Sequence, residues 1–291
     1  MIYAIGDIHG QHTMLCALLT KLIELPLHPE DTVVFLGDYV DRGENARGVI
    51  ETLLQWRDRH TNTVFLRGNH EQLMLDAYSD DLDSTAVPDP TLHAQLTLVW
   101  LQNGGIETLL SYAPTGFQDW CETVGYSLLR IPANPLANFK ASFSRWLTAI
   151  PQSHWEFLQA TQMDYVTPRY HFVHAGLLTP RKTWASEGWT IDPRLWIREP
   201  FLSSRANFGG RIVVFGHTPQ RKGPLVHRNK IGLDTGAVFG GPLTAGIFAP
   251  QVQAPRFIQV PHIRPAPLSY GDSDRSVSAR PRASSARSSR K

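Results

Sequence analysis

Residues 2–10 read IYAIGDIHG, an apolar run that ends in a Gly-Asp-x-His-Gly motif, and this stretch decides the fold. Four apolar residues that stop at a glycine are typical of a short buried β-strand. Asp7 and His9 follow directly, and their side chains can converge on one cation from the loop after the strand. A lone Gly-Asp pair is more often a turn whose carboxylate caps a local amide. The interpretation therefore depends on what the rest of the chain adds.

Two further stretches repeat the order of strand and polar motif. Residues 32–43 read TVVFLGDYVDRG, and residues 63–71 read TVFLRGNHE. Helical patterns follow the first two motifs, with apolar residues three and four apart over residues 12–25 and 46–59. Consecutive strand–motif–helix units predict an α/β fold with parallel strands, whose carboxyl ends meet at one edge of the sheet.

The second half of the chain has a different pattern. Residues 80–165 lack strand patterns and carry tryptophans within helical patterns, which predicts a mostly helical insert over or beside the site. Strand patterns then return, among them YHFVHAG at residues 170–176 and RIVVFGHT at residues 211–218. Each of these two strands ends at a histidine, so the second half is expected to add two more polar side chains to the same edge.

The end of the chain differs in composition from the rest. Residues 263–291 are rich in Ser and Arg with almost no large apolar side chain, so we expect a disordered tail behind a catalytic domain of residues 1–262. The formal net charge of +2 comes largely from this tail. We interpret the tail as a solvated extension, with contact to an anionic partner such as nucleic acid or acidic protein as the alternative.

Composition also limits the class of protein. Hydrophobic residues make up 42% of the 291 residues, enough for a globular core, and no apolar run approaches the roughly 20 residues of a membrane span. The chain has two cysteines, which argues against a disulfide framework and favours a reducing cytoplasm. Cys16 falls within a helical apolar pattern, and we expect it to be a small buried hydrophobic residue.

The polar motifs together supply carboxylate, imidazole and amide groups but no thiolate. This set suits a pair of hard or borderline divalent metals better than a thiolate zinc site. Two metals that share a bridging carboxylate are a common device for hydrolysing phosphate esters. An asparagine beside a histidine after a third strand is difficult to explain by packing alone. We therefore expect a dinuclear metal site at the carboxyl ends of the strands.

In this order and spacing, Gly-Asp-x-His-Gly, Gly-Asp-x-Val-Asp-Arg-Gly and Gly-Asn-His-Glu resemble the signatures of the phosphoprotein phosphatases, a branch of the calcineurin-like metallophosphoesterases. The resemblance is close over residues 1–75. His174-Ala175-Gly176 and Gly216-His217-Thr218 resemble the two later histidine motifs of the family. The compact length and the run from Asp234 to Gly241 are similar to bacterial and phage members. The resemblance implies an α/β fold of two packed β-sheets flanked by helices.

The resemblance also implies a role for each motif residue. The residues that would hold the two metals, with Asp38 as the bridge, are Asp7, His9, Asp38, Asn69, His174 and His217. The metals, Mn²⁺ with Fe or Zn as alternatives, would lower the pKa of a shared water and so supply hydroxide for in-line attack on phosphorus. Arg42 and Asn69 would bind the phosphate. His70, oriented by Asp41, would protonate the leaving alkoxide.

Four assignments have a competing interpretation. His70 is the general acid, or alternatively a further metal ligand or a turn residue. Arg198 is the candidate for a second phosphate-binding arginine, and an ion pair with Glu199 or another surface acid is an equal alternative. Glu71 supports a metal ligand from behind, or instead caps a local backbone group or faces solvent. Asp234 either lies near the metals or merely starts a glycine turn.

The leading functional prediction is a serine/threonine protein phosphatase, with phosphotyrosine as a further substrate. The first alternative is the symmetric hydrolase of diadenosine tetraphosphate, whose bacterial type is similar in fold and metal set. That hydrolase usually has Asp where this chain has Glu71 and often lacks Asp41, which favours the phosphatase. A broader phosphodiesterase fits less well, because Arg42 suits a terminal phosphate. A non-catalytic phosphate-binding module is disfavoured, because every ligand position of the family is occupied.

Overall fold

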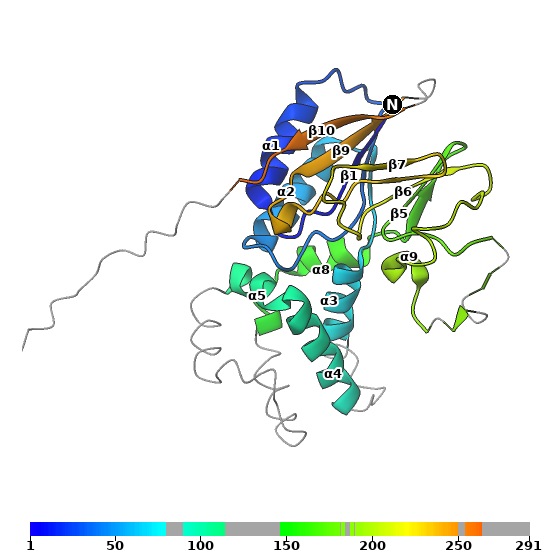
Figure 1. Cartoon of the computed structure of the whole chain (residues 1–291). Helices are drawn as coiled ribbons and strands as arrows, with labels where there is room; N and C mark the ends of the chain where they lie inside the picture. Colours follow the sequence, from blue (N-terminus) through cyan, green and yellow to red (C-terminus); the bar gives the residue numbers. More distant parts are fainter. Residues whose placement is uncertain are drawn as a thin grey trace, which may run out of the picture.

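The computed structural model describes residues 1–79, 90–113, 146–180, 182–183, 187–188, 190–249 and 254–263. The described chain forms two five-stranded sheets that pack face to face, with helices around them (Figure 1). This is the α/β arrangement expected from the motifs. Among the described residues, no helix has the length and apolar character needed to cross a bilayer.

The first sheet contains the three strand–motif–helix units and has the order β10-β9-β1-β2-β3. Its parallel strands are β1 (Ile2–Ile5), β2 (Thr32–Phe35) and β3 (Thr63–Phe65). On the other side of β1 lie the antiparallel strands β9 (Leu243–Phe248) and β10 (Arg256–Val260). Helices α1 (His12–Ile23) and α2 (Ala46–Arg59) cover the outer face of this sheet (Figure 1).

The second sheet has the order β4-β5-β6-β8-β7. Its parallel centre consists of β5 (Tyr170–Val173), β6 (Ile212–Phe215) and β8 (Lys230–Gly232). The antiparallel edges are β4 (Asp164–Val166) and β7 (Leu225–His227), which the sequence patterns did not predict. Each edge strand has three residues, none fully buried, so neither has an apolar run long enough to be recognised.

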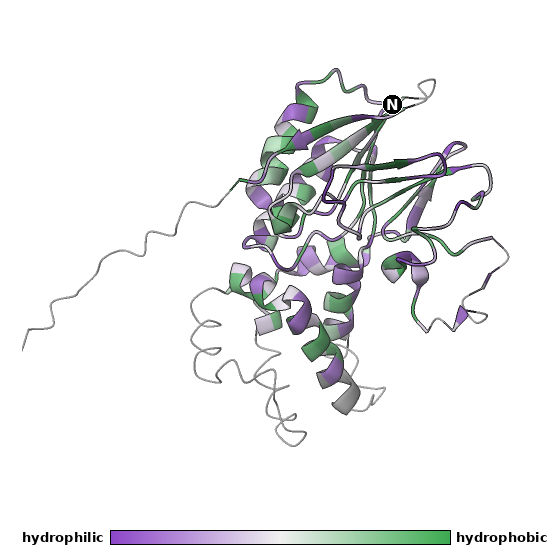
Figure 2. Ribbon diagram, viewed as in Figure 1, coloured by the Kyte–Doolittle hydropathy of each residue, from purple (hydrophilic) through white to green (hydrophobic). Residues whose placement is uncertain are grey.

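Because successive side chains of a strand point to opposite faces, the first sheet contributes to two hydrophobic cores. Ala4 and Val34 point between the sheets, whereas their neighbours Tyr3, Ile5 and Phe35 point toward the helices. The space between the sheets is closed by aromatic rings; Phe248 of the first sheet has its ring centroid 5.0 Å from that of Tyr170 of the second. Figure 2 shows hydrophobic residues along the strands of both sheets. This sandwich fixes the two rows of strand ends relative to one another.

The helices after β3 lie together below the sheets in Figure 1. They are α3 (Asn69–Ser79), α4 (Pro90–Trp100), a π-helical turn η1 (Leu101–Gly105), α5 (Ile106–Tyr112) and α8 (Gln152–Gln159). The described parts of the expected insert, residues 80–165, are thus mostly helical, and β4 begins at its end. Residues 80–89 and 114–145 of that insert, and 264–291 of the tail, lie outside the described residues, so the division into domain, insert and tail stays a prediction. Two further short helices are α9 (Pro193–Trp196) and η4 (Ala237–Phe239).

One prediction about α1 was wrong. The helix buries one face through residues such as Leu15, Leu18 and Leu22, as expected. Cys16, however, is exposed, because the residue after Leu15 lies about 100° further around the helix. Its Sγ is 3.4 Å from Nε2 of His12, one turn earlier. Its place within the apolar pattern of the helix had suggested burial, but the position itself falls on the exposed side.

Candidate dinuclear metal centre

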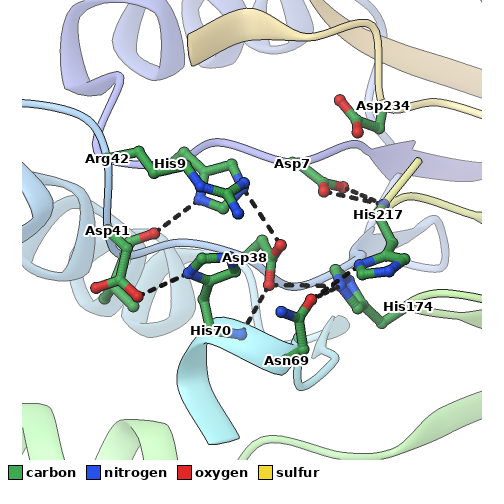
Figure 3. A network of polar contacts seen from close by, with 12 residues as sticks. Asp7, His9, Asp38, Asp41, Arg42, Asn69, His70, His174, His217 and Asp234 are labelled. Atoms are coloured by element: carbon green, nitrogen blue, oxygen red, sulfur yellow. Dashed lines mark hydrogen bonds and ion pairs between the residues drawn. The ribbon is translucent and has the colours of Figure 1, made fainter. Parts of the chain in front are cut away.

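The polar motifs meet where the parallel strands of both sheets end (Figure 3). Asp7 and His9 follow β1, and Asp38 follows β2. Asn69 and His70 begin α3 directly after β3. His174 follows β5, and His217 follows β6. Two sheets therefore deliver their side chains to one place, which explains why residues so distant in sequence become neighbours.

The backbone of these loops is held in an uncommon conformation. Within the described chain, the non-glycine residues with positive φ are His9, Asp38, Asp41, Arg42 and His217, with φ from 45° to 72°. Residues other than glycine rarely adopt this region, although Asp and His tolerate it better than most. Such conformations persist where surrounding structure enforces them, and they cluster at functional sites. Every one of these residues belongs to the candidate site.

Asp38, Asn69, His174 and His217 form one half of the site. Nδ1 of His174 donates to the carbonyl of Leu36 at 2.8 Å, so the neutral ring has its lone pair on Nε2. That Nε2 lies 3.0 Å from Oδ1 of Asn69 and 3.4 Å from Oδ1 of Asp38. Nδ1 of His217 lies 2.9 Å from the same Asn69 oxygen. The Nε2 lone pair of His174 thus faces two side-chain oxygens at close range, and a ring nitrogen of His217 meets the same Asn69 oxygen.

The other half of the site uses the opposite oxygen of Asp38. Nδ1 of His9 donates to the carbonyl of Val40 at 2.9 Å, which leaves the Nε2 lone pair facing the site. That Nε2 is 3.3 Å from Oδ2 of Asp38 and accepts from Nη1 of Arg42 at 3.0 Å. The carboxylate of Asp7 accepts from the backbone N–H of His217 at 2.9 Å. Asp38 therefore lies between the two halves, as a bridging ligand must.

The residues of this site fit divalent metals. Ligand atoms of His9, Asp38 and His70 lie within 4.8 Å of one another, and so do those of Asp38, His174 and His217. Burial and the nearby His174 lower the pKa of His217 to about 2, so its ring is neutral and able to coordinate. Nε2 of His217 is also buried and has no hydrogen-bond partner within the described chain.

Buried carboxylates point to the same conclusion. Burial, and then the charge of Asp234, raises the pKa of Asp7 well above its ordinary value. Burial raises the pKa of Asp234 itself to about 6, although its carboxylate accepts from the N–H of Gly236 at 2.9 Å. Asp234 thus starts a glycine turn and also lies near Asp7. The two interpretations of Asp234 are therefore compatible. Carboxylates gathered in a buried site require compensating positive charge, which metal ions would supply.

His70 and Asp41 form a buried pair at the side of the site. Nδ1 of His70 is 2.7 Å from Oδ2 of Asp41, and the exposed fractions of both side chains are at most 1%. The ring of His70 packs edge-on to that of His9, with centroids 4.6 Å apart. His70 therefore sits next to the metal ligands with one nitrogen committed to a carboxylate. The same closeness makes it geometrically able to be a ligand, so its role stays a proposal.

Glu71 is buried and does not face solvent. Its carboxylate accepts four backbone N–H groups, those of Asp38 (2.8 Å), Tyr39 (2.7 Å), Val40 (3.3 Å) and Gly68 (2.8 Å). Burial, and then the charge of Asp38, raises its pKa to about 7. Glu71 thus holds the turn that presents Asp38, and its bond to Gly68, the residue before α3, also caps that helix. The supporting and the capping interpretations both match the structure, whereas exposure to solvent does not.

The two arginines differ in their surroundings. Arg42 reaches His9, and its Cζ lies 5.7 Å from the centre of the Phe239 ring, which is 66% exposed at the rim. Arg198 is exposed, and its positive charge contributes to the lowered pKa of His217. The carboxylate of Glu199 accepts from Ser203 instead, at 2.6 Å. Arg198 is therefore close enough to His217 for its charge to affect that ring, and its binding of phosphate stays a prediction.

The fold and the site together define a class of protein. The chain belongs to the calcineurin-like phosphoesterases, whose family model matches residues 1–241, so it is a member of a family of metal-dependent phosphoester hydrolases. It is 30% identical over 250 residues to serine/threonine-protein phosphatase 1 of Salmonella typhimurium (strain LT2), covering 84% of this chain and 89% of that protein.

A solved structure provisionally described as a diadenosine tetraphosphatase superposes on this fold. It has a TM-score of 0.52 at 21% identity and covers 91% of this chain and 94% of that one. A likeness at this identity shows the fold alone. The predicted fold class is thereby confirmed.

Three residues near the site were not singled out from the sequence. Trp100 and Thr108 both donate to the Asp41 carboxylate from the helical insert. Phe239 lies in the glycine-rich turn after β8. Tryptophan in a helical pattern is ordinarily core, and no spacing in the chain relates residue 100 to residue 41. Of the three, only Phe239 could have been found from the sequence, because it is an aromatic residue among glycines.

Proposed function

We propose that the chain is a dinuclear, metal-dependent phosphomonoesterase that acts as a serine/threonine protein phosphatase, with phosphotyrosine as a further substrate. The observation that carries the proposal is the buried Asp41–His70 pair beside Arg42 and the shared Asp38. A metal site alone fits any phosphoester, whereas an oriented acid serves a poor leaving group such as a serine alkoxide. The similarity to a serine/threonine phosphatase supports the same choice.

The proposed ligands are Asp7, His9 and Asp38 for one metal and Asp38, Asn69, His174 and His217 for the other. When bound, the metals would supply hydroxide at neutral pH for attack on phosphorus. Mn²⁺ is the proposed metal, with Fe or Zn as alternatives, because the ligands are oxygen and nitrogen atoms. The scarcity of cysteine supports the cytoplasm as the proposed compartment.

The remaining residues bind and protonate the substrate. Arg42, with Arg198 and the Asn69 amide, would hold the phosphate oxygens; the planar fork of Arg42 can bind two of them at once. Nδ1 of His70 is engaged by Asp41, so Nε2 is the nitrogen that would give its proton to the leaving oxygen. Asp41 fixes the ring orientation and stabilises its protonated form.

The second candidate is a diadenosine tetraphosphate hydrolase. The exposed ring of Phe239 beside Arg42 favours it, because a flat aromatic surface at the rim can stack a nucleobase. The oriented Asp41–His70 pair favours the phosphatase, since a nucleotide leaving group needs less help from an acid.

A side-by-side measurement of kcat/KM separates the two candidates. The substrates are a phosphothreonine peptide, a phosphotyrosine peptide and diadenosine tetraphosphate, each with Mn²⁺ supplied. We expect a large preference for the phosphothreonine peptide. A large preference for the dinucleotide would replace the phosphatase by the hydrolase, and metal binding without turnover of any ester would support a binding module. Asp38→Asn, prepared identically, controls for contaminating phosphatases.

A further inference from the structure

The carboxylate of Asp41 is enclosed by the helical insert. Nε1 of Trp100 donates to both carboxylate oxygens, at 3.0 and 3.1 Å, and Oγ1 of Thr108 donates to Oδ1 at 2.7 Å. Thr108 Oγ1 also accepts from the backbone N–H of Asp41 at 2.9 Å. All three residues are fully buried. With His70 on Oδ2, three side chains donate to one carboxylate, and two of them come from the insert.

The shape of the chain between these donors makes the contact possible. Trp100 ends α4, Thr108 lies in α5, and the π-helical turn joins them; we call residues 100–108 the insert turn. Gly104 has a φ of 112°, and its carbonyl accepts from the backbone N–H of Arg42 at 3.1 Å. A Cβ added at Gly104 would lie 2.6 Å from that nitrogen. The insert turn can therefore approach the Asp41–Arg42 backbone only with glycine here.

From these contacts we infer that the insert turn positions the general acid, with Trp100 and Thr108 as the positioning residues. The inference rests on the proposed function. As the attacking hydroxide forms its bond to phosphorus and the bond to the leaving oxygen breaks, Nε2 of His70 gives its proton to that oxygen. The ring is then neutral and keeps its Nδ1–H on Asp41. Trp100 and Thr108 prevent the carboxylate from rotating, so the ring stays aimed at the leaving oxygen.

The inference predicts an effect that depends on the leaving group. A nitrophenolate leaves without a proton, whereas a threonine alkoxide does not. Trp100→Phe keeps an aromatic ring but removes the N–H, and Thr108→Val removes only the hydroxyl. We expect each variant to lose about 10- to 100-fold more kcat on a phosphothreonine peptide than on p-nitrophenyl phosphate. Thr108→Ser, which keeps the hydroxyl, should restore the wild-type ratio of the two substrates.

The insert also supplies a matched control. Oγ1 of Thr97 on α4 is buried and has no hydrogen-bond partner within the described chain. Thr97→Val therefore makes the same chemical change on a neighbouring part of the insert without touching Asp41, and we expect the wild-type substrate ratio. Equal losses on both substrates in Trp100→Phe and Thr108→Val, or no loss in either, would overturn the inference.

A second readout does not depend on turnover. In the Zn²⁺-loaded protein, the Nδ1 proton of His70 should give a downfield NMR resonance, assigned by its absence in His70→Asn. We expect the resonance to persist in Thr97→Val and Thr108→Ser and to broaden through faster exchange in Trp100→Phe. An unchanged resonance in Trp100→Phe would contradict the positioning role. If the wild type fails to hydrolyse the peptide, the proposed function fails, while this measurement still tests the inference.

Discussion

Oε1 of Glu71 accepts the backbone N–H of Tyr39 at 2.7 Å, so the third motif holds the second motif in place. Oε2 does the same for Asp38 itself, at 2.8 Å. The side chain that looks like a helix cap in the sequence thus supports the carboxylate shared by both halves of the site. Its four backbone contacts make the conformation of the Asp38 loop dependent on one carboxylate.

Replacing this carboxylate by an amide should weaken metal binding. Glu71→Gln keeps one accepting oxygen but points an NH₂ group at backbone donors, so we expect metal affinity to fall about 10- to 100-fold. Competition with a chelator measures the affinity. Glu51→Gln on α2 makes the same change at a side chain that is 44% exposed and should leave affinity at the wild-type value. Equal affinity in the two variants would show that Glu71 does not support the site.

Arg42 should control inhibition by the product phosphate. Arg42→Ala removes the guanidinium, and Arg42→Lys keeps the charge but loses the planar fork, so we expect both to raise the inhibition constant for phosphate, by about tenfold or more in the alanine variant. Steady-state inhibition by inorganic phosphate measures this constant. Arg47→Ala, at a side chain that is 48% exposed, is the control. A constant that does not change in Arg42→Ala would remove Arg42 from the phosphate site.

Lys230 should stabilise the second sheet without affecting catalysis. Its buried ammonium donates to the carbonyls of Phe201, Leu202 (3.0 Å) and Ser204 (2.7 Å) and lies 4.6 Å from the centre of the Phe201 ring. Lys230→Met leaves these carbonyls without their donor, and we expect a loss of about 1–3 kcal/mol in the free energy of unfolding. Urea denaturation measures this free energy, and kcat should stay at the wild-type value.

The same variant has a pH signature. Burial lowers the pKa of Lys230 below its ordinary value of 10.5, so the unfolded chain holds this proton more tightly than the folded chain. The unfavourable contribution of the buried charge is therefore relieved as pH rises toward 10.5. We expect the stability difference between wild type and Lys230→Met to grow over that range. A difference that shrinks with rising pH would contradict this direction.

Cys16 should react in the native protein, because its thiol is exposed on α1. In a Cys121→Ser background, a thiol reagent should label Cys16 at nearly the same rate with and without denaturant. Reaction only after unfolding would mean that the side chain is buried. Cys16→Ser in the same background controls for labelling elsewhere.

The sequence predicted those parts of the molecule that depend on local patterns. The helix over residues 46–59 was predicted with its observed bounds, because its apolar spacing is visible in the sequence. The three strands that precede the first motifs, and the glycines around Asp38, were predicted from equally local patterns. Their convergence followed from the rule that parallel strands present their carboxyl ends at one edge.

What could not be predicted depends on contacts between distant segments. The bonds from Trp100 and Thr108 to Asp41 span about sixty residues, and neither residue type suggests such a partner. Burial of Glu71 depends on how the loop after β2 folds over α3. The exposure of Cys16 depends on which side of α1 meets the sheet. In each case the missing information is the packing of one element against another.

The most direct test of the account is the metal content per chain of wild type, His70→Asn and Asp38→Asn, measured by elemental analysis after removal of loosely bound ions. The account predicts two metals in the wild type and in His70→Asn, together with a loss of turnover of about two to four orders of magnitude in His70→Asn. It predicts that Asp38→Asn retains neither. Loss of metal from His70→Asn would make His70 a ligand and contradict the acid role, and full metal content in Asp38→Asn would contradict the shared site.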